Sequence, residues 1–212
     1  MAAASPCAGR LITFEGIDGC GKSTQARLLA DSLRASGHPV VLTREPGGAP
    51  GAEQIRRLLV EGDTARWSSE TECLLFTAAR RDHLEKTIRP ALDAGQVVVS
   101  DRFVDSTRVY QGAARGDLRA LVDRLHALTI GLEPHLTFVL DMDAGEALAR
   151  GLARGSGEDR FEAFGGDFQN RLRLGFRALA AEFPARVRLV DAARPAEAIA
   201  AGIAAEAAGL LA

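Results

Sequence analysis

The sequence predicts an α/β fold built on a doubly wound parallel sheet of five strands, with helices on both faces. Three observations indicate this fold. Five short apolar runs recur along the chain, and each is continuous rather than alternating, as is typical of strands covered on both faces. Helical patterns separate the runs. A glycine-rich segment, GIDGCGKST, joins the first run to the first helix.

The predicted elements alternate along almost the whole chain. The apolar runs predict strands at 10–15 (RLITFE), 39–43 (PVVLT), 96–101 (QVVVSD), 136–143 (LTFVLDMD) and 186–191 (RVRLVD). Helical patterns lie between and after them, at 22–36, 50–60, 69–94, 117–131, 143–154, 167–182 and 195–210. This alternation indicates strand–helix units and therefore a parallel sheet.

The chain shows no internal repeat, linker or shift of composition that would divide it. We therefore expect an Ala-rich tail at 1–9 and a single domain at 10–212. Glycines and arginines gather in RGLARGSGEDRFEAFGG, at 150–166. This segment is interpreted as a lid, and a solvated surface loop is the alternative.

Composition excludes several classes of protein. Among 212 residues the formal net charge is −2, so no overall positive field would attract nucleic acid or an anionic membrane. The apolar runs are too short to span a bilayer. Three cysteines without paired or metal-site spacing favour a reduced, cytoplasmic protein. Only two of the 26 basic residues are lysines, Lys22 and Lys86.

One of those lysines lies in a phosphate-binding loop. Gly16, Gly21, Lys22 and Ser23 match G-x-x-x-x-G-K-[ST] between a strand and a helix, which is the setting the motif requires. The glycines let successive backbone N–H groups turn into one concavity, and the helix N-terminus adds its own N–H groups. Lys22 would neutralise β- and γ-phosphate oxygens, and the Ser23 hydroxyl would bind Mg²⁺.

The loop also contains a cysteine, Cys20, and two hypotheses account for it. A thiol among N–H groups at a helix start would have a lowered pKa and react readily. Alternatively, Cys20 is a small side chain that fills the loop.

Two features of other nucleotide-binding proteins are missing from the sequence, and their absence narrows the class of protein. Neither lysine lies in an Asn-Lys-x-Asp motif, so a guanine-specific switch has little support. The chain also has no room for the further domains of a motor or transporter ATPase.

Four segments resemble bacterial thymidylate kinases and occur in the order typical of that family. They are FEGIDGCGKST (14–24), TREPGG (43–48), LLFTAARRDHLEKTIRPAL (74–92) and SDRFVDSTRVYQG (100–112), and LVDA (189–192) follows near the end. The resemblance implies a P-loop fold of the nucleoside monophosphate kinase type with a short lid. It also implies transfer of the γ-phosphate of ATP to dTMP with Mg²⁺, in a homodimer.

The resemblance further implies the site residues. ATP would bind Gly16, Ile17, Asp18, Gly19, Cys20, Gly21, Lys22, Ser23, Thr24 and the lid arginines Arg150, Arg154 and Arg160. Thymidylate would bind Asp18, Arg44, Phe76, Arg80, Arg102, Ser106, Thr107, Tyr110 and Gln111. Ser23 and Asp101 would serve the metal.

Each implied role suits the chemistry of its side chain. Arg44 and Arg102 would bind the acceptor phosphate, because a guanidinium meets two oxygens at once. Asp18 would reach the sugar 3′-hydroxyl, and Tyr110 would close against the 2′ side, beside Gln111 on the same wall. Asp101 follows a buried strand and would orient Mg²⁺ through water.

The base would be read by residues of two segments. Phe76 and Arg80 lie one helical turn apart and so share a face, which suits stacking on thymine and donation to its carbonyl oxygen. Thr107, with Ser106 nearby, would meet the N3 edge.

The resemblance leaves the phosphoryl-transfer cation to the lid. Some members of the family carry an arginine within the loop, where this chain has Gly19. The implied finger is Arg154, with Arg150 and Arg160 in support. Two alternatives remain open: a kinase for another small acceptor such as a deoxynucleoside, and a regulator that binds a nucleotide without transferring phosphate.

Overall fold

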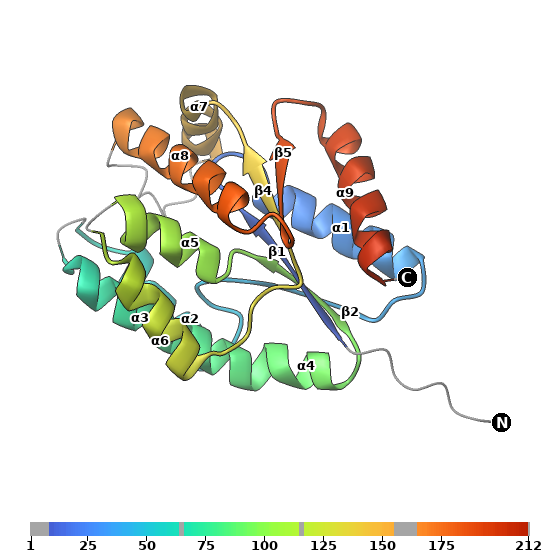
Figure 1. Ribbon diagram of the computed structural model, residues 1–212, viewed down its shortest axis with the longest axis horizontal. Helices are drawn as coiled ribbons and strands as arrows, with labels where there is room; N and C mark the ends of the chain where they lie inside the picture. Colours follow the sequence, from blue (N-terminus) through green and yellow to red (C-terminus); the bar gives the residue numbers. More distant parts are fainter. Residues whose placement is uncertain (1–8, 64–65, 115–116, 155–164, 212) are drawn as a thin grey trace.

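The computed structural model describes residues 9–63, 66–114, 117–154 and 165–211, with the backbone alone at 113–114 and 152–154. Five parallel strands form one sheet in the order β2-β3-β1-β4-β5 (Figure 1). The strands are β1 Arg10–Glu15, β2 Val40–Arg44, β3 Val97–Asp101, β4 Leu136–Asp141 and β5 Val187–Asp191. All five lie where the sequence predicts them, although β4 ends two residues earlier than expected.

The helices surround the sheet. They are α1 Lys22–Ala35, α2 Pro50–Val60, α3 Ser69–His83, α4 Arg89–Asp93, α5 Val104–Val109, α6 Arg119–Thr129, α7 Ala144–Arg154, α8 Gly166–Glu182 and α9 Ala196–Leu211. Two π-helical turns extend them, η1 Leu84–Ile88 and η2 Tyr110–Ala114. The helix predicted at 69–94 is present as α3, η1 and α4 in succession. The prediction missed α5 and η2, because a six-residue helix is too short to show a periodic apolar pattern.

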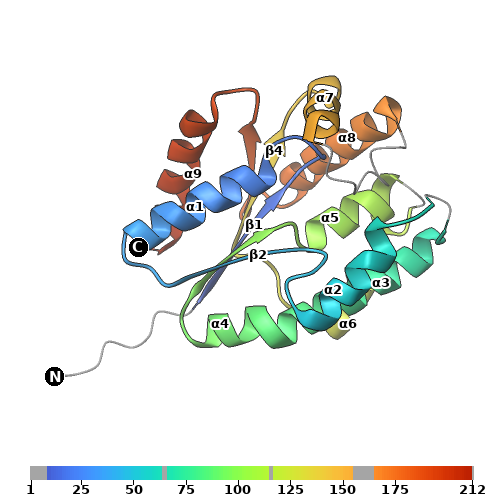
Figure 2. The ribbon, with the colours of Figure 1, turned by 180° about the vertical axis from the view of Figure 1, so that it is seen from behind.

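Apolar side chains of alternate strand residues form the two cores. Ile12 and Phe14 of β1 belong to a core that includes residues of α1 and α9, whereas Leu11 belongs to one that includes residues of α3, α5 and α6. Helix α8 packs on β4 and β5 and against α5. Figure 2, seen from behind, shows α1 and α9 next to each other along one side of the sheet. No described helix is both long and apolar enough to cross a membrane.

The strand order places β1 at the switch point of the sheet. Strand β1 pairs with β3 on one side and with β4 on the other. The chain builds the β2–β3 side first and passes to the other side of β1 after β3, where it forms β4 and β5. Ligands of open α/β sheets bind beyond the carboxyl ends of strands at such a point. The strands end here in polar residues, Glu15, Arg44, Asp101, Asp141 and Asp191.

Candidate active site

The glycine-rich loop connects β1 to α1. Gly16, Gly19 and Gly21 have φ values of 133°, 85° and 99°, which lie in the region that favours glycine. Lys22 is 6% exposed, and its Nζ donates to the carbonyl oxygen of Ile17 at 2.7 Å. No side chain caps the N-terminus of α1. The helix start is therefore a site for an anion, because its first N–H groups and the positive end of its dipole face the loop.

Helix α7 packs directly on this loop at Gly19. A Cβ atom there would lie 1.8 Å from the carbonyl oxygen of Ala147 and 3.1 Å from the nitrogen of Gly151. Both contacts are with backbone, which cannot turn aside as the end of a side chain can. No larger residue fits at Gly19, so a loop arginine is excluded on steric grounds.

The structure overturns the hypothesis of a reactive Cys20. Its side chain is buried, 3% exposed, and belongs to the core beneath the loop. Burial raises the pKa of the thiol above its ordinary value, and the nearby Lys22 and Arg102 charges oppose this only in part. The thiolate is disfavoured, and Cys20 fills space in the loop, as the alternative proposed.

Ser23 and Asp101 lie together beside the loop. The Ser23 Oγ donates to Oδ2 of Asp101 at 2.5 Å. The other carboxylate oxygen, Oδ1, is buried and has no hydrogen-bond partner within the described residues. A hydroxyl oxygen and an unsatisfied carboxylate oxygen are ligands that suit Mg²⁺. This ion usually takes one or two protein ligands and its remaining ligands from water and phosphates. The residues present therefore fit the metal.

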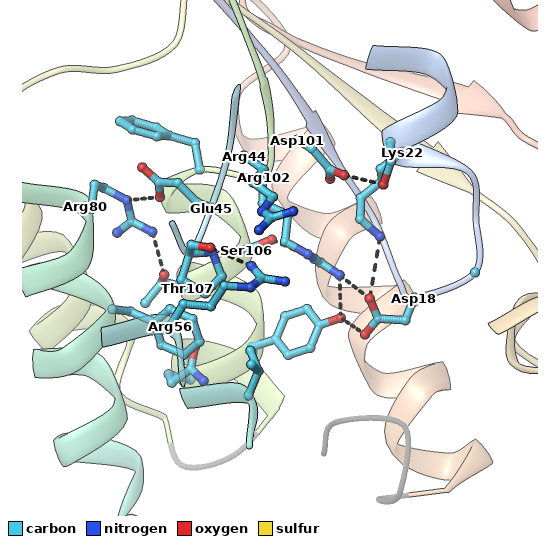
Figure 3. Close-up of a pocket in the computed structure, with 18 of the residues that line it drawn as sticks. Asp18, Lys22, Arg44, Glu45, Arg56, Arg80, Asp101, Arg102, Ser106 and Thr107 are labelled. Atoms are coloured by element: carbon cyan, nitrogen blue, oxygen red, sulfur yellow. Dashed lines mark hydrogen bonds and ion pairs between the residues drawn. The ribbon is translucent and has the colours of Figure 1, made fainter. Parts of the chain in front are cut away.

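A pocket of about 290 Å³ opens below the loop, at the carboxyl ends of β2 and β3 (Figure 3). Its wall includes all the acceptor-side residues that the family resemblance implies. They are Asp18, Arg44, Phe76, Arg80, Arg102, Ser106, Thr107, Tyr110 and Gln111. Gly19, Gly21, Lys22, Ser23 and Asp101 line the same pocket. Residues of the loop and residues of the acceptor-side motifs thus line one continuous pocket.

Arg102 lies at the centre of the pocket in a strained backbone conformation. Its φ is 70°, unusual for a residue with a side chain, and its N–H donates to the carbonyl oxygen of Phe14 at 2.9 Å. The guanidinium donates to Asp18 at 2.5 Å and to Ser106 at 2.8 Å. Strain of this kind persists only where the surroundings hold the residue, which here aims its charge into the pocket.

Asp18 is held on both oxygens. Oδ1 accepts from Arg102, and Oδ2 accepts from the Tyr110 hydroxyl at 3.0 Å. Burial alone would raise the pKa of Asp18, but the charges of Arg102 and Lys22 and the Tyr110 hydrogen bond lower it to about 2. Asp18 is therefore ionised throughout the neutral range and acts as an acceptor.

The opposite wall of the pocket carries Arg80, and its orientation is fixed by hydrogen bonds. Its Nε donates to Glu45 at 2.7 Å, and its Nη2 donates to Oγ1 of Thr107 at 2.9 Å. Half-buried Phe76 lines the pocket one turn before it. Glu45 follows β2 within the TREPGG segment. Sequence reasoning did not single it out, although a carboxylate is the partner that a buried arginine requires.

Two further arginines line the pocket near α2. Arg44 is 3.4 Å from Glu53, and Arg56 donates from Nη1 to the carbonyl oxygen of Pro46 at 2.5 Å. Arg56 could not be recognised from the sequence, because in a helical pattern it looks like any solvated residue. Only its position beside the pocket distinguishes it.

The lid arginines are described only in part. Arg150 is exposed on α7. Arg154 ends that helix, and its side chain lies outside the described residues, as does Arg160. The described part of the segment predicted as a lid consists of the end of α7 and the start of α8.

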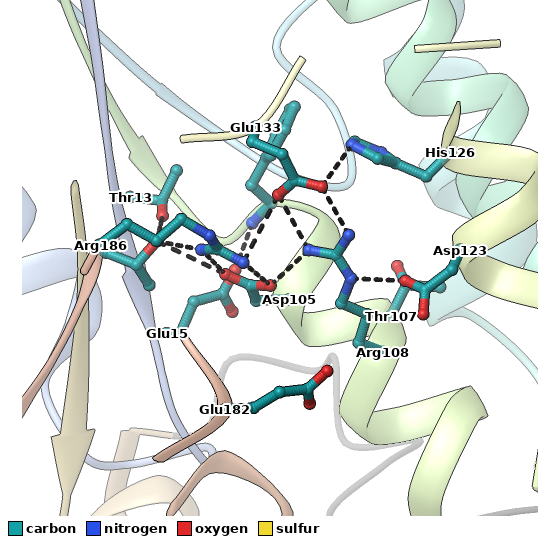
Figure 4. A network of polar contacts seen from close by, with 12 residues as sticks. Thr13, Glu15, Asp105, Thr107, Arg108, Asp123, His126, Glu133, Glu182 and Arg186 are labelled. Carbon is teal, nitrogen blue, oxygen red and sulfur yellow. Dashed lines mark hydrogen bonds and ion pairs between the residues drawn. The ribbon is translucent and has the colours of Figure 1, made fainter. Parts of the chain in front are cut away.

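Ion pairs of Asp105 and Arg108 anchor α5 to distant segments of the chain (Figure 4). Asp105 is fully buried and accepts from Arg108 at 2.8 Å and from Arg186 at 2.6 Å. Glu133 accepts from the same Arg108 at 2.6 Å. Since α5 carries Ser106 and Thr107, this network fixes the floor of the pocket.

Glu15 supports the start of α5 from β1. It is fully buried and accepts from the backbone N–H of Phe103 at 2.8 Å and from the Ser106 hydroxyl at 2.5 Å. Burial and the nearby Asp105 raise the pKa of Glu15 to about 8, against the opposing hydrogen bonds and the Arg102 charge. Between the ordinary pKa of a glutamate and about pH 8, Glu15 is therefore protonated in the folded protein and ionised in the unfolded chain.

This shift predicts a pH dependence of stability. Between about pH 4.5 and 8 the folded state binds the proton more tightly, so the free energy of unfolding should fall as pH rises. The contribution of Glu15 approaches about 1.4 kcal/mol per pH unit where the two states differ by a whole proton. Glu15→Gln should flatten the profile, measured by urea unfolding from pH 5 to 9. The exposed Glu197→Gln is the control, and equal slopes in wild type and Glu15→Gln would contradict the shift.

Comparisons with known proteins agree with the family resemblance of the site motifs. The family model described as thymidylate kinase matches residues 14–203. A thymidylate kinase of Ruegeria pomeroyi is 64% identical over 195 residues, 92% of each chain. One of Dinoroseobacter shibae is 67% identical over 195 residues, 92% of this chain and 94% of its own. The crystal structure of thymidylate kinase from Ehrlichia chaffeensis superposes with a TM-score of 0.74 at 36% identity, covering 92% of this chain and 96% of that one.

Proposed function

The chain belongs to the thymidylate kinase family, and from that premise we propose that the pocket below its phosphate loop binds dTMP while the loop binds the triphosphate of ATP. Enzymes of this family are phosphotransferases that act on dTMP. One observation carries the proposal: a single pocket is lined by Lys22 and Ser23 at one end and by Phe76 and Arg80 at the other. An acceptor in it would have its phosphate beside the loop.

The acceptor phosphate is assigned to Arg102 and Arg44. Arg102 is central, lies next to Asp18 and is held in place by Ser106, so its charge is preorganised. Asp18 is assigned to the sugar 3′-hydroxyl, because an ionised carboxylate can accept a hydrogen bond from it. Tyr110 donates to Asp18 at 3.0 Å, which is consistent with its closing the pocket beside the sugar.

The base is assigned to the opposite wall. Phe76 offers an aromatic face for stacking. Arg80 offers donors to a carbonyl oxygen, Thr107 is assigned to the N3 edge, and Gln111 lines the same pocket. Ser106 donates to Glu15 and accepts from Arg102, which supports a role in holding the arginine.

Catalysis is assigned to positioning and charge. The acceptor phosphate is already an oxyanion, so no general base is required. Lys22 would neutralise the transferred group, and Ser23 and Asp101 would hold Mg²⁺. The metal, when bound, supplies charge neutralisation at the β- and γ-phosphates. A further positive charge at the transferred group is assigned to Arg154, since the loop has Gly19 and no arginine of its own.

The experiment that tests the proposal is an ADP-release assay with ATP and four acceptors: dTMP, thymidine, dUMP and dCMP. Turnover should be fastest with dTMP and absent with thymidine, which lacks the phosphate that Arg102 and Arg44 would bind. Turnover with thymidine alone would instead support a deoxynucleoside kinase. ATP binding without turnover of any acceptor would support a nucleotide-dependent regulator.

In the same assay we expect a limited preference for thymine over uracil. The two bases differ by one methyl group, and a missing methyl in an apolar pocket is worth roughly 10- to 100-fold in kcat/KM. dUMP should therefore be a poorer substrate by about that factor, and still a measurable one. Equal kcat/KM values for dUMP and dTMP would contradict the assigned base pocket.

A homodimer is also proposed. Three neighbouring helices expose leucines: Leu58 of α2 is 37% exposed, Leu74 of α3 is 56% and Leu128 of α6 is 79%. A second copy of the chain would cover them. Light scattering should give a dimer that Leu74→Glu dissociates and that Leu174→Glu, equally exposed on α8, leaves intact. A monomeric wild type would contradict the dimer.

A further inference from the structure

A buried acid, Glu72, lies behind the base-side wall of the pocket. It is on α3 and fully buried, and its Oε2 accepts a hydrogen bond from Nε2 of Gln111 at 3.0 Å. Gln111 lies in η2, is 1% exposed and lines the pocket. The motifs that identify the site do not account for Glu72.

The chemistry of Glu72 decides which way the Gln111 amide faces. A carboxylate has only acceptor atoms, so it must meet the amide nitrogen and not the amide oxygen. The amide oxygen, Oε1, is thereby turned away from Glu72. It is buried and has no hydrogen-bond partner in the described ranges. Buried acceptors without partners are rare in folded proteins, and a ligand in the pocket is the natural donor.

We propose that Glu72 is a positioning residue that fixes Gln111 as an acceptor and so selects pyrimidines with an N–H at N3. Thymine and uracil carry that N–H, whereas N3 of cytosine is itself an acceptor. Cytosine would leave two acceptors facing each other. This inference rests on the proposed function, because it needs a pyrimidine in the pocket.

The neighbouring groups do not supply this selection by themselves. The Thr107 hydroxyl accepts from Arg80, and its own hydrogen can rotate, so it serves a donor or an acceptor equally. Arg80 has only donors, directed by Glu45, and selects at another atom of the base. A change at Glu72 should therefore weaken the discrimination against cytosine without abolishing it.

Glu72→Gln tests the inference, because the new amide can either donate or accept and no longer fixes Gln111. The kcat/KM ratio of dTMP to dCMP should fall about 10- to 100-fold, the effect of one buried hydrogen bond. The ratio of dTMP to dUMP should stay unchanged, since both carry the N3 hydrogen. A merely structural defect would lower kcat/KM for all three substrates alike, and that result would overturn the proposal.

A double-mutant cycle with Gln111→Ala shows whether Glu72 acts through Gln111. Gln111→Ala should reduce the dTMP to dCMP ratio, and adding Glu72→Gln should then change it no further. If Gln111→Ala reduces the ratio and Glu72→Gln alone does not, the positioning role is refuted. Glu70→Gln, exposed on the same helix, is the matched control and should leave the ratio as in wild type.

Folding and the proposed function are checked separately. Circular dichroism verifies each variant, and if Glu72→Gln does not fold, Glu72→Asp makes the same comparison with the carboxylate withdrawn by one carbon. Wild type that fails to phosphorylate dTMP would refute the proposed function itself. Wild type that phosphorylates dTMP, with a dTMP to dCMP ratio untouched by Glu72→Gln or Glu72→Asp, would refute only this inference.

Discussion

Arg154→Ala is expected to lower kcat by about 10³- to 10⁵-fold, the effect of removing an arginine finger from phosphoryl transfer. The KM for dTMP should stay close to that of wild type, because Arg154 is not among the residues assigned to dTMP. The charge on the transferred group develops in the transition state, so a cation that meets it there changes kcat.

The packing of α7 supports this choice of arginine. Ala147 and Gly151 lie against Gly19, one helical turn apart. Arg154 is the next position on the same helical stripe, at the spacing i, i+4, i+7. The helix thus runs past the loop, and its last residue follows the two that contact Gly19.

Single-turnover phosphoryl transfer in rapid-quench experiments measures the chemical step directly. Arg150→Ala and Arg160→Ala are the matched controls, and each should lower the rate less than Arg154→Ala. A small effect of Arg154→Ala with a large effect of either neighbour would move the finger to that neighbour. Small effects of all three would contradict a lid arginine altogether.

Lys22→Met is the second large effect, with an expected loss of about 10²- to 10³-fold in kcat, typical of removing one preorganised charge from a transition state. Methionine keeps the length of the side chain and removes its ammonium group. Lys22 is buried in the loop, so its charge acts in a site of low dielectric, where it is worth more than in water.

The chain offers one matched control, because Lys86 is its only other lysine. Lys86 is half exposed and pairs with Asp82 on the surface. Lys86→Met should leave kcat within about twofold of wild type, as expected for a surface ion pair. If Lys22→Met retained most of the activity, the loop would not be the donor site.

The sheet could be predicted from the sequence because each strand is a short, mainly apolar run that ends in a polar residue. The long helix at 69–94 was equally clear, although its π-helical turn at 84–88 was not. Helix α5 escaped prediction for a physical reason. Its own Asp105 accepts from the distant Arg186, and Glu15 of β1 accepts from Phe103 at its start, so the helix is held by remote parts of the chain and not by a pattern of its own.

The site shows the same division. The family motifs indicated the residues that would touch a ligand, and all nine acceptor-side residues line one pocket. The residues that orient them were not predicted. Glu45 fixes Arg80, and Glu72 fixes Gln111, across 35 and 39 residues of sequence. Only the fold brings such pairs together.

The Cys20 hypothesis was wrong because sequence proximity does not give burial. Its neighbours suggested an environment of N–H groups and positive charge. The fold instead turns the thiol into the core, and the cost of burying a charge outweighs that attraction.

A crystal structure with dTMP and a non-hydrolysable ATP analogue bound together tests the central assignment most directly. We expect the thymine ring against Phe76, the monophosphate at Arg102 and the triphosphate on the backbone around Lys22. The two phosphate chains should face each other within the one pocket. Thymidylate bound outside this pocket, or bound with its base at the loop and its phosphate at Arg80, would contradict it.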